Sequence, residues 1–255
     1  MTPATPGPGP DDLPFPPLPV MPLLAGLVDD AGLFPPSWLP MDEALARHRA
    51  SISPMLSGRF LCPGDRVGEL LALLDASAGS SLDVHLLGDA TVDLPTDLRL
   101  RVRAVELRSG VMPQLPCYLE GVDPRELAGH GVFGKLRCGG VRLPPVEEVA
   151  AYVLSAARMS VPFKATAGMH AAVRGWESTK GEPHHGYLNL LLAVARALSA
   201  GDVLEVLRCT DGDALAHEAC ELSGDLVTAT RWLFRSYGSC DTAKPVTDAM
   251  TLGLL

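Results

Sequence analysis

Lysine is scarce in this chain, and the motifs that identify several common enzyme classes are missing. No GxGxxG, P-loop or GxSxG pattern occurs, so nothing points to a dinucleotide-binding enzyme, a phosphate-loop NTPase or a serine α/β-hydrolase. No apolar run reaches the roughly 18 residues that predict a transmembrane helix. Of the 21 basic residues only four are lysines: Lys135, Lys164, Lys180 and Lys244.

Basic patches with interleaved aromatic residues are also missing. Aromatic residues make up 5% of the chain and the net charge is −9, which argues against a nucleic-acid-binding surface. The hydrophobic fraction of 47% is that of a globular protein with an ample core. The partner predicted is therefore a small-molecule substrate, with neither nucleic acid nor membrane, and a homo-oligomer stays open.

The six cysteines form no CxxC pair, and several lie in apolar runs such as FLC and VLRC. This usage predicts buried, reduced thiols rather than a disulfide framework or a zinc site. The first residues, MTPATPGPGPDDLPFPPLP, lack the basic and apolar regions of a signal peptide. Together these features predict a cytoplasmic protein, and no motif calls for a cofactor.

Composition divides the chain into a proline-rich arm, residues 1–22, and a single α/β domain, residues 23–255. The aspartate pair that follows the first apolar run, Asp29 and Asp30, is expected in a loop or at a helix end over the barrel mouth, and the alternative is that one of its carboxylates reaches a site. The segment 213–237 is expected to be helical. Strand patterns occur at 58–62, 82–89, 101–108, 115–122, 133–140, 161–168 and 202–210.

Strand and helix patterns alternate over the second half of the chain, which is typical of parallel βαβ units. An eight-stranded (β/α) TIM-like barrel fits the length and the strand count best. The connections 89–100 and 109–114 are too short for full helices, so the barrel should be irregular in its first half. A doubly wound open sheet is the alternative.

Two of the scarce lysines, Lys135 and Lys164, stand on neighbouring predicted strands among apolar or small residues. Side chains alternate along a strand, so Lys135 shares a face with Arg137, and Lys164 shares one with Thr166. In a barrel both pairs can point toward the carboxyl-terminal mouth, where active sites lie. Burial and a neighbouring cation both lower the pKa of an amine, and a neutral amine can form a Schiff base with a carbonyl compound.

Glycines follow both lysines, and their backbone can approach a ligand closely. They are predicted to bind a phosphate or carboxylate of the substrate, together with Arg137 and Thr166. The glycines concerned are Gly139, Gly140 and Gly168.

The stretch from Lys135 to Gly139, followed by a helix and then by FKATAG at 163–168, resembles the two lysine-bearing strands of deoxyribose-phosphate aldolase. That family carries a K-T-S-T-G strand and later a K-x-x-G-G strand. The resemblance implies a class I aldolase in which Lys135 forms the Schiff base and Lys164 tunes it. Lys135 is followed by Leu-Arg-Cys rather than Thr-Ser-Thr. The segments KLRCGG, FKATAGMH, HHGYLN and YGSC resemble uncharacterised bacterial proteins, which implies no activity.

A count of strands nominates the other lysine. Lys164 would lie on the sixth predicted barrel strand, where many class I aldolases and dehydratases place their Schiff-base lysine. Its strand is also the more apolar of the two. On these grounds Lys164 is the preferred nucleophile, and Lys135 and Arg137 are expected to tune its pKa and to bind an anion.

Glu120 and His170 are the candidate proton shuttles, because Glu120 stands near the end of the predicted strand before Lys135 and His170 stands just past Gly168, near the mouth. His185 and Asn189 are added as candidate substrate-binding residues from the following loop and helix. In a purely structural reading, the lysines form ion pairs with Glu106 or Glu120 inside the barrel.

A metal site is a weaker alternative. It would combine His170 and His184 with Asp29 or Glu120, but neither HxH nor HExxH occurs, so no metal is predicted. The roles of Asp30 and Cys240 stay open.

The sequence thus favours a lyase or aldolase acting on a small carbonyl compound, with an anionic group as one option, through a lysine imine. Two alternatives remain. One is a barrel isomerase or hydrolase that binds a carboxylate or phosphate without a covalent intermediate. The other is a non-catalytic binding protein.

Overall fold

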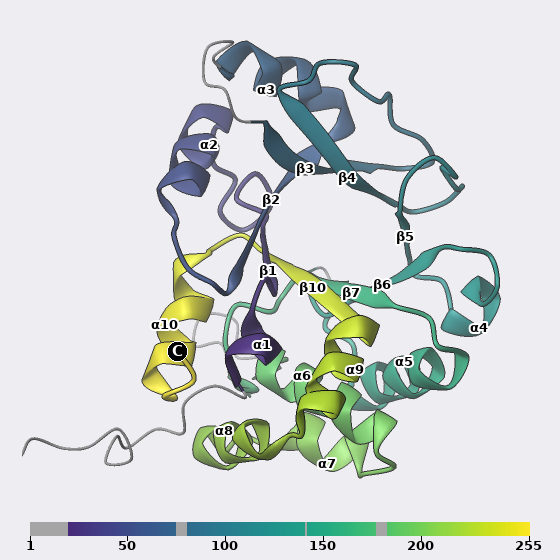
Figure 1. The fold of residues 1–255 in the computed structure, drawn as a ribbon, viewed down its shortest axis with the longest axis vertical. Coiled ribbons are helices and arrows are strands. Elements are labelled where there is room, and N and C mark those ends of the chain that lie inside the picture. The colour runs from purple at the N-terminus through teal and green to yellow at the C-terminus, as the bar shows by residue number, and fades with distance from the viewer. Residues whose placement is uncertain (1–19, 75–80, 141, 177–182) are drawn as a thin grey trace, which may run out of the picture.

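A closed barrel of parallel strands forms the centre of the molecule. The structure is a computed structural model and describes residues 20–74, 81–140, 142–176 and 183–255. Eight strands close the barrel in the order β1-β10-β7-β6-β5-β4-β3-β2, and every pair of neighbours is parallel (Figure 1). The predicted α/β TIM-like barrel is therefore confirmed.

Helices separate most of the barrel strands along the chain, but β3, β4 and β5 follow one another directly, and a small two-stranded hairpin lies outside the barrel. The barrel strands are β1 Val28–Asp30, β2 Leu56–Pro63, β3 Leu82–Gly88, β4 Leu100–Leu107, β5 Cys117–Glu120, β6 Phe133–Arg137, β7 Phe163–Thr166 and β10 Phe234–Ser239. The hairpin strands are β8 Gly175–Trp176 and β9 Pro183–His184. The helices are α1 Val20–Leu24, α2 Met41–Ala50, α3 Val67–Leu73, α4 Pro124–Leu127, α5 Val146–Met159, α6 Tyr187–Leu198, α7 Val203–Arg208, α8 Gly212–Glu221, α9 Gly224–Leu233 and α10 Ala243–Thr251, with a 3₁₀ turn at Gly64–Arg66.

The two halves of the barrel are covered differently. No helix occurs in the connections 89–99 and 108–116, both of which the structure describes in full, and α4 has only 4 residues. The predicted irregularity of the first half is thus confirmed. In the second half α5 to α9 gather on one side of the barrel (Figure 1). Helix α6 is buried all round over its first nine residues and packs against α5, α7, α8 and α9.

The first barrel strand was not predicted. Asp29 and Asp30 were expected in a loop or at a helix end, but they belong to β1, which pairs with both β2 and β10. The strand has only 3 residues, two of them aspartates, so it shows no alternating apolar pattern. The barrel supplies the cations that make two buried carboxylates tolerable.

Two further predictions at the carboxyl-terminal end were wrong. Residues 202–210 were expected to form a strand, but Val203–Arg208 is the helix α7, whose first turn is capped by Asp202 accepting from the amide of Glu205. The predicted helical segment through residue 237 ends at Leu233, where strand β10 begins without an intervening loop. Propensity cannot place such a junction because packing against β7 and β1 decides it.

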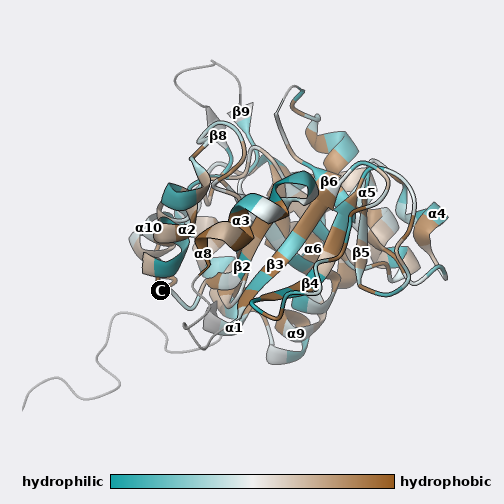
Figure 2. Cartoon of the chain, turned by 90° about the horizontal axis from the view of Figure 1, so that it is seen from above, coloured by the Kyte–Doolittle hydropathy of each residue, from teal (hydrophilic) through white to brown (hydrophobic). Residues whose placement is uncertain are grey.

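The core lies between the barrel and its helices, in two clusters. The larger joins β7 and β10 to helices α5 to α9, and the smaller joins β2 to β5 to α2 and α3. Figure 2 shows how polar and apolar residues intermix along β3 and β4 in the poorly covered half. None of the helices in the described part of the chain combines the length and apolar character that a bilayer crossing requires. Residues 1–19 of the predicted proline-rich arm lie outside the described residues.

Candidate active site

Strand register brings the predicted residues to one level inside the barrel. Glu120 of β5 is paired in register with Lys135 of β6, and Lys135 is paired with Lys164 of β7. Residues in register on parallel neighbours point to the same side, so the three side chains enter the barrel at one depth. The register therefore places these three side chains, from successive strands, side by side inside the barrel.

Lys164 lies at the centre of a buried charged cluster that also contains Asp29, Glu106 and Lys135, and it has no exposed surface. Its Nζ donates to Asp29 Oδ2 at 2.7 Å and to Glu106 Oε1 at 2.5 Å. The ring of Tyr118 lies 5.8 Å from the same nitrogen. The ammonium is therefore held between a carboxylate from β1 and one from β4, two strands that β2 and β3 separate in the barrel.

Each of these carboxylates has further partners. Asp29 Oδ1 accepts from Arg59 Nε and from Ser57 Oγ at 2.7 Å each, and its Oδ2 accepts from Ser236 Oγ at 2.7 Å. Glu106 Oε1 lies 2.9 Å from Nδ1 of His85, which is buried and stacked on Tyr118. The barrel interior thus holds its charges in a connected network, as buried charges require.

The network shifts the pKa values of its members in opposite directions. Burial alone lowers the pKa of Lys164, but the charges of Asp29 and Glu106 outweigh it and raise the pKa above the ordinary value. Burial likewise favours the neutral forms of Asp29 and Glu106, yet Lys164 and the other cations hold both pKa values well below their usual range. The expectation that Lys164 carries a lowered pKa is wrong, because carboxylates and not cations are its nearest neighbours.

These shifts predict how stability depends on pH. The lowered pKa values of Asp29 and Glu106 contribute stability above their unfolded values of about 4, and this is lost as the pH falls. The raised pKa of Lys164 contributes stability below about 10.5, and this is lost as the pH rises. We expect the urea midpoint to be flat from about pH 5 to 9 and to decline on both sides.

The exposed Lys244, paired with Asp248, offers a matched control. A Lys244→Met variant should keep the same profile, because a surface pair contributes little to stability. A midpoint that rose steadily below pH 4 would contradict the ionised cluster.

Lys135 occupies a different position, at the floor of a cleft. Its Nζ lies 3.1 Å from Glu106 Oε2 and 3.1 Å from Glu120 Oε2, and the residue is 5% exposed. Glu106 Oε2 accepts no hydrogen bond from the described residues, although it lies beside this ammonium. Arg137 Nε donates to Glu120 Oε1 at 2.7 Å. Burial raises the pKa of Glu120, but the neighbouring cations Lys135 and Arg137 lower it by more, so the net pKa lies below its ordinary value.

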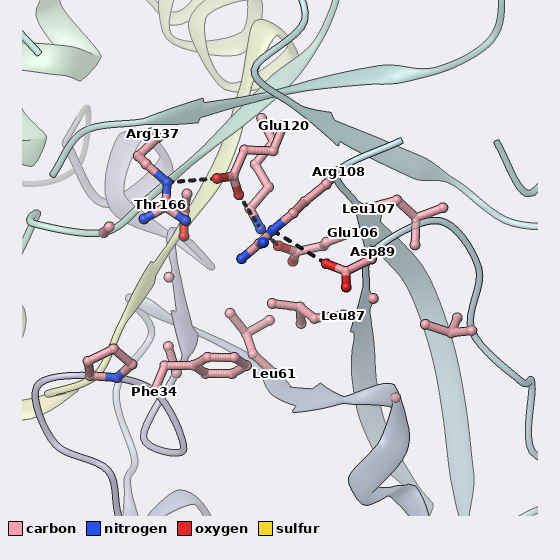
Figure 3. A pocket seen from close by; sticks show the side chains of 18 of the residues that line it. Phe34, Leu61, Leu87, Asp89, Glu106, Leu107, Arg108, Glu120, Arg137 and Thr166 are labelled. Atoms are coloured by element: carbon pink, nitrogen blue, oxygen red, sulfur yellow. Dashed lines mark hydrogen bonds and ion pairs between the residues drawn. The ribbon is translucent and has the colours of Figure 1, made fainter. Parts of the chain in front are cut away.

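The cleft opens at the carboxyl-terminal ends of the strands and has a volume of about 1140 Å³. Figure 3 shows Glu106, Glu120, Arg137 and Arg108 on one side of it, from β4, β5, β6 and the residue after β4. Lys135 lines the cleft and Lys164 does not. Among the predicted site residues the cleft also takes in Thr166 and His170.

His170 lies at the rim beside a cysteine. The Sγ of Cys240 is 3.8 Å from both ring nitrogens, and the His170 Nδ1 is 3.4 Å from Ser239 Oγ. Burial raises the pKa of the Cys240 thiol, but hydrogen bonds from His170 and Ser37 outweigh it, so that the net pKa is lowered. The structure therefore places His170 where an acid–base group could meet a ligand at the mouth.

The glycines have a packing role. Gly139 and Gly168 lie back to back, and a Cβ on Gly139 would come within 2.9 Å of the Gly168 Cα. Gly140 adopts a φ of 97° beside the Arg137 guanidinium. The residues lining the cleft include none of these three, so substrate binding by the glycines stays a prediction that their position does not favour.

Gly168→Ala should destabilise the fold by about 2–4 kcal/mol, because it adds a contact to an unfavourable φ. Gly168 has a φ of 72°, and its Cβ would lie 3.0 Å from the carbonyl oxygen of Cys138. Gly58 has the same φ of 72° but nothing within 4 Å. Gly58→Ala should therefore lose only about 1 kcal/mol in urea unfolding, and equal losses at both positions would contradict the packing role.

His185 and Asn189 lie outside the cleft. His185 is buried with Nε2 at 2.8 Å from the Pro144 carbonyl oxygen. The Asn189 side chain accepts from the Arg174 amide and donates to the carbonyl oxygens of Val206 and Cys209. Asn189 thus ties α6 to α7 and to the loop before β8, whereas His185 ties the loop before α6 to the loop before α5. Neither residue is among those that line the cleft.

One group of described residues has the spacing of metal ligands, and it differs from the set considered from sequence. Single ligand atoms of Asp29, His85 and Glu106 lie within 4.8 Å of one another. The ammonium of Lys164 already bonds to both carboxylates of this group. A divalent ion bound there would face that positive charge, so the donor set fits a lysine better than a metal.

His85 and Arg59 were not predicted from the sequence as site residues, and Asp29 was considered only as a carboxylate that could reach a site or bind a metal. His85 had a signal: in LDVHLLG it stands between the buried Val84 and Leu86, on the opposite face of the strand. Asp30 turns away from the network and pairs with Arg47 at 2.6 Å, which also binds the Cys240 carbonyl.

The chain is thus a parallel eight-stranded barrel of the TIM type, with a buried charged cluster at its core and a cleft above it. The cluster consists of Asp29, Glu106, Lys135 and Lys164. No protein-family model, curated protein or solved structure matches the chain.

Proposed function

We propose that the protein is a lyase of the aldolase type that acts on a small carbonyl compound through an imine on Lys135. The observation that carries the proposal is the position of the Lys135 amine. It lies at the floor of the cleft, between the carboxylates of Glu106 and Glu120, and Lys164 stands behind Glu106.

The proposed nucleophile is therefore Lys135 and not Lys164, which was the preferred residue on sequence grounds. Lys164 has no exposed surface, and a carbonyl carbon could reach its nitrogen only by displacing one of its two carboxylate partners. The preference for Lys164 also depended on a strand count that omitted β1. With β1 included, Lys135 is on the sixth strand and Lys164 on the seventh.

Both lines of sequence reasoning now nominate the same residue. The resemblance to deoxyribose-phosphate aldolase implied that Lys135 forms the imine and Lys164 tunes it. The corrected strand count agrees. Lys164 acts through Glu106, which it shares with Lys135, and so sets the charge around the imine nitrogen.

Imine formation leaves the net charge at the lysine nitrogen unchanged. The lysine ammonium and a carbonyl compound give a protonated imine and one water, so a single positive charge stands between Glu106 and Glu120 before and after the step. The nitrogen loses a proton for its attack, and the adjacent carboxylates are in place to receive it. Carboxylates that stabilise the ammonium also stabilise the iminium.

Bond cleavage then needs a second acid–base group. When the bond between the α and β carbons breaks, its electron pair moves toward the iminium nitrogen and gives an enamine. The β-hydroxyl loses its proton as a carbonyl forms. Glu120 lies beside the nitrogen, and His170 lies at the rim of the same cleft, so these two residues are the proposed proton carriers.

A second candidate keeps the site and omits the covalent step. Arg108 and Arg137 line the cleft with side chains that are 73% and 44% exposed, so a carboxylate or phosphate could bind them while Glu120 and His170 move protons. This arrangement would suit an isomerase or a hydrolase.

Reductive trapping separates the two candidates. Incubation with small aldehydes and 2-oxo acids in the presence of borohydride should add the mass of one reduced carbonyl compound to Lys135. Peptide mapping identifies the residue. The exposed Lys244 serves as the internal control for non-specific modification.

The absence of any adduct on Lys135 across a panel of such compounds would overturn the imine mechanism. An adduct on Lys164 instead would show that the buried ammonium is released during turnover.

A further inference from the structure

The cleft has two unlike walls. The charged wall carries Glu120, Arg137 and Arg108 (Figure 3). The facing wall is largely apolar, and Figure 3 shows Phe34, Leu61 and Leu87 along it, with Asp89 at its edge as the ion-pair partner of Arg108. A very short, fully polar substrate would make no contact with the second wall. The apolar wall therefore indicates that the substrate has an apolar part.

The apolar wall comes from three separate segments. Leu61 belongs to β2 and Leu87 to β3, while Phe34 lies in the loop between β1 and α2. The same loop adds Pro35 and Trp38 to the cleft lining. Three segments distant in sequence thus present apolar side chains to one cavity, directly across from the reactive lysine's side of the barrel.

Trp38 is more exposed than Phe34, Leu61 and Leu87. It is 68% exposed, although burial of an indole is strongly favourable in water. Its backbone has a φ of 45°, in the left-handed region that a bulky residue avoids. The loop is held in place by hydrogen bonds from the Trp38 amide to the Phe34 carbonyl and from the Leu39 amide to the Gly32 carbonyl. An exposed indole fixed at the edge of a cavity is suited to stacking on a ligand.

The volume of the cleft also indicates a substrate larger than a few carbon atoms. The cleft measures about 1140 Å³, and cavities of roughly 300–1,000 Å³ are typical for drug-sized ligands. A carbonyl compound of a few carbons would leave most of this space to water. A longer substrate with an apolar end would fill it.

We infer that the substrate is an amphipathic carbonyl acid, with an aromatic or branched aliphatic group against Phe34 and Trp38. Its carbonyl would lie at Lys135, and its carboxylate would lie near Arg137 and Arg108. The inference rests on the proposed function for the carbonyl, whereas the apolar group and the carboxylate are assigned from the two walls alone.

Binding of unreactive probes tests the inference without any chemistry. Acetate, phenylacetate and 2-phenylethanol contain no reactive carbonyl, and calorimetry measures their affinities. We expect phenylacetate to bind at least tenfold more tightly than acetate, because it adds a stacked ring, and several-fold more tightly than the neutral alcohol.

Variants of the wall locate the effect. Trp38→Ala and Phe34→Ala should each reduce the preference for phenylacetate over acetate by roughly fivefold, while the affinity for acetate stays unchanged. Trp232→Ala is the matched control, because Trp232 is also an exposed tryptophan, at 47%, and does not line the cleft. Circular dichroism confirms that each variant is folded.

The two proposals fail in different ways. Equal binding of acetate and phenylacetate, or a preference that survives both Trp38→Ala and Phe34→Ala, would overturn the inferred substrate class. If Lys135 could not be trapped while the preference persisted, the imine would be excluded but the amphipathic ligand retained. Lys135→Arg should leave the preference intact, because the ring contacts the other wall.

Discussion

We expect Lys135→Arg to abolish reductive trapping and to lower turnover by at least about 10³-fold, with the fold retained. Arginine keeps a positive charge between Glu106 and Glu120, so the electrostatic role of Lys135 in the barrel is largely preserved. The guanidinium remains protonated and cannot attack a carbonyl carbon. The substitution therefore removes the nucleophile while leaving most of the ion pairs in place.

The measurement combines mass spectrometry with a turnover assay on whichever carbonyl compound the unmodified protein traps. Urea unfolding confirms that stability has changed by no more than about 1–2 kcal/mol, the range for a small change in packing. Lys244→Arg is the control for a lysine remote from the cleft. A Lys135→Arg protein that retained turnover would support the non-covalent isomerase or hydrolase.

The lysine pair was predictable from sequence because it depends on local information. Lys135 and Lys164 each stand in a short apolar strand, and a helix of suitable length joins those strands. A right-handed βαβ unit places the two strands side by side and parallel. The only further requirement is the register, which pairs Lys135 with Lys164 directly.

The sequence could not predict how deeply each lysine amine is buried in the barrel. Which amine reaches the cleft depends on carboxylates from β1 and β4, far away in the sequence. Asp29 stands in a three-residue strand without a pattern, and its contact with Lys164 follows only from closure of the barrel between β1 and β10. The same closure changed the strand count and with it the expected nucleophile.

The apolar wall was equally hidden from sequence reasoning. Phe34 and Trp38 lie in the proline-containing loop FPPSWLP, which reads as an ordinary turn. Leu61 and Leu87 read as ordinary strand residues. Only the barrel, which brings the ends of β1, β2 and β3 together at one rim, shows that these residues face a cavity.

Lys164→Met should be the most destabilising single substitution in the barrel, with a loss of about 3–5 kcal/mol of unfolding free energy. Methionine fills a similar volume but carries no charge. Asp29 keeps Arg59 and Glu106 keeps Lys135 as partners. However, the two buried carboxylates then face each other without the cation that lay between them.

Urea unfolding at neutral pH measures the loss, and Lys244→Met is the matched control. Lys244 forms an exposed pair with Asp248, so its removal should change stability by less than about 1 kcal/mol. A comparable loss of unfolding free energy in both variants would mean that the buried ion pairs of Lys164 contribute no more to stability than an exposed pair does.

A second substitution tests the physical reason. If the loss in Lys164→Met comes from uncompensated negative charge, then adding Glu106→Gln should recover part of it, about 1–3 kcal/mol, because one carboxylate becomes neutral. If it came from lost packing alone, the second substitution would add to the damage. The sign of this coupling therefore decides whether Lys164 supports the barrel mainly as a charge. In that case the electrostatic environment it creates around Glu106 is the same one that Lys135 meets at the floor of the cleft.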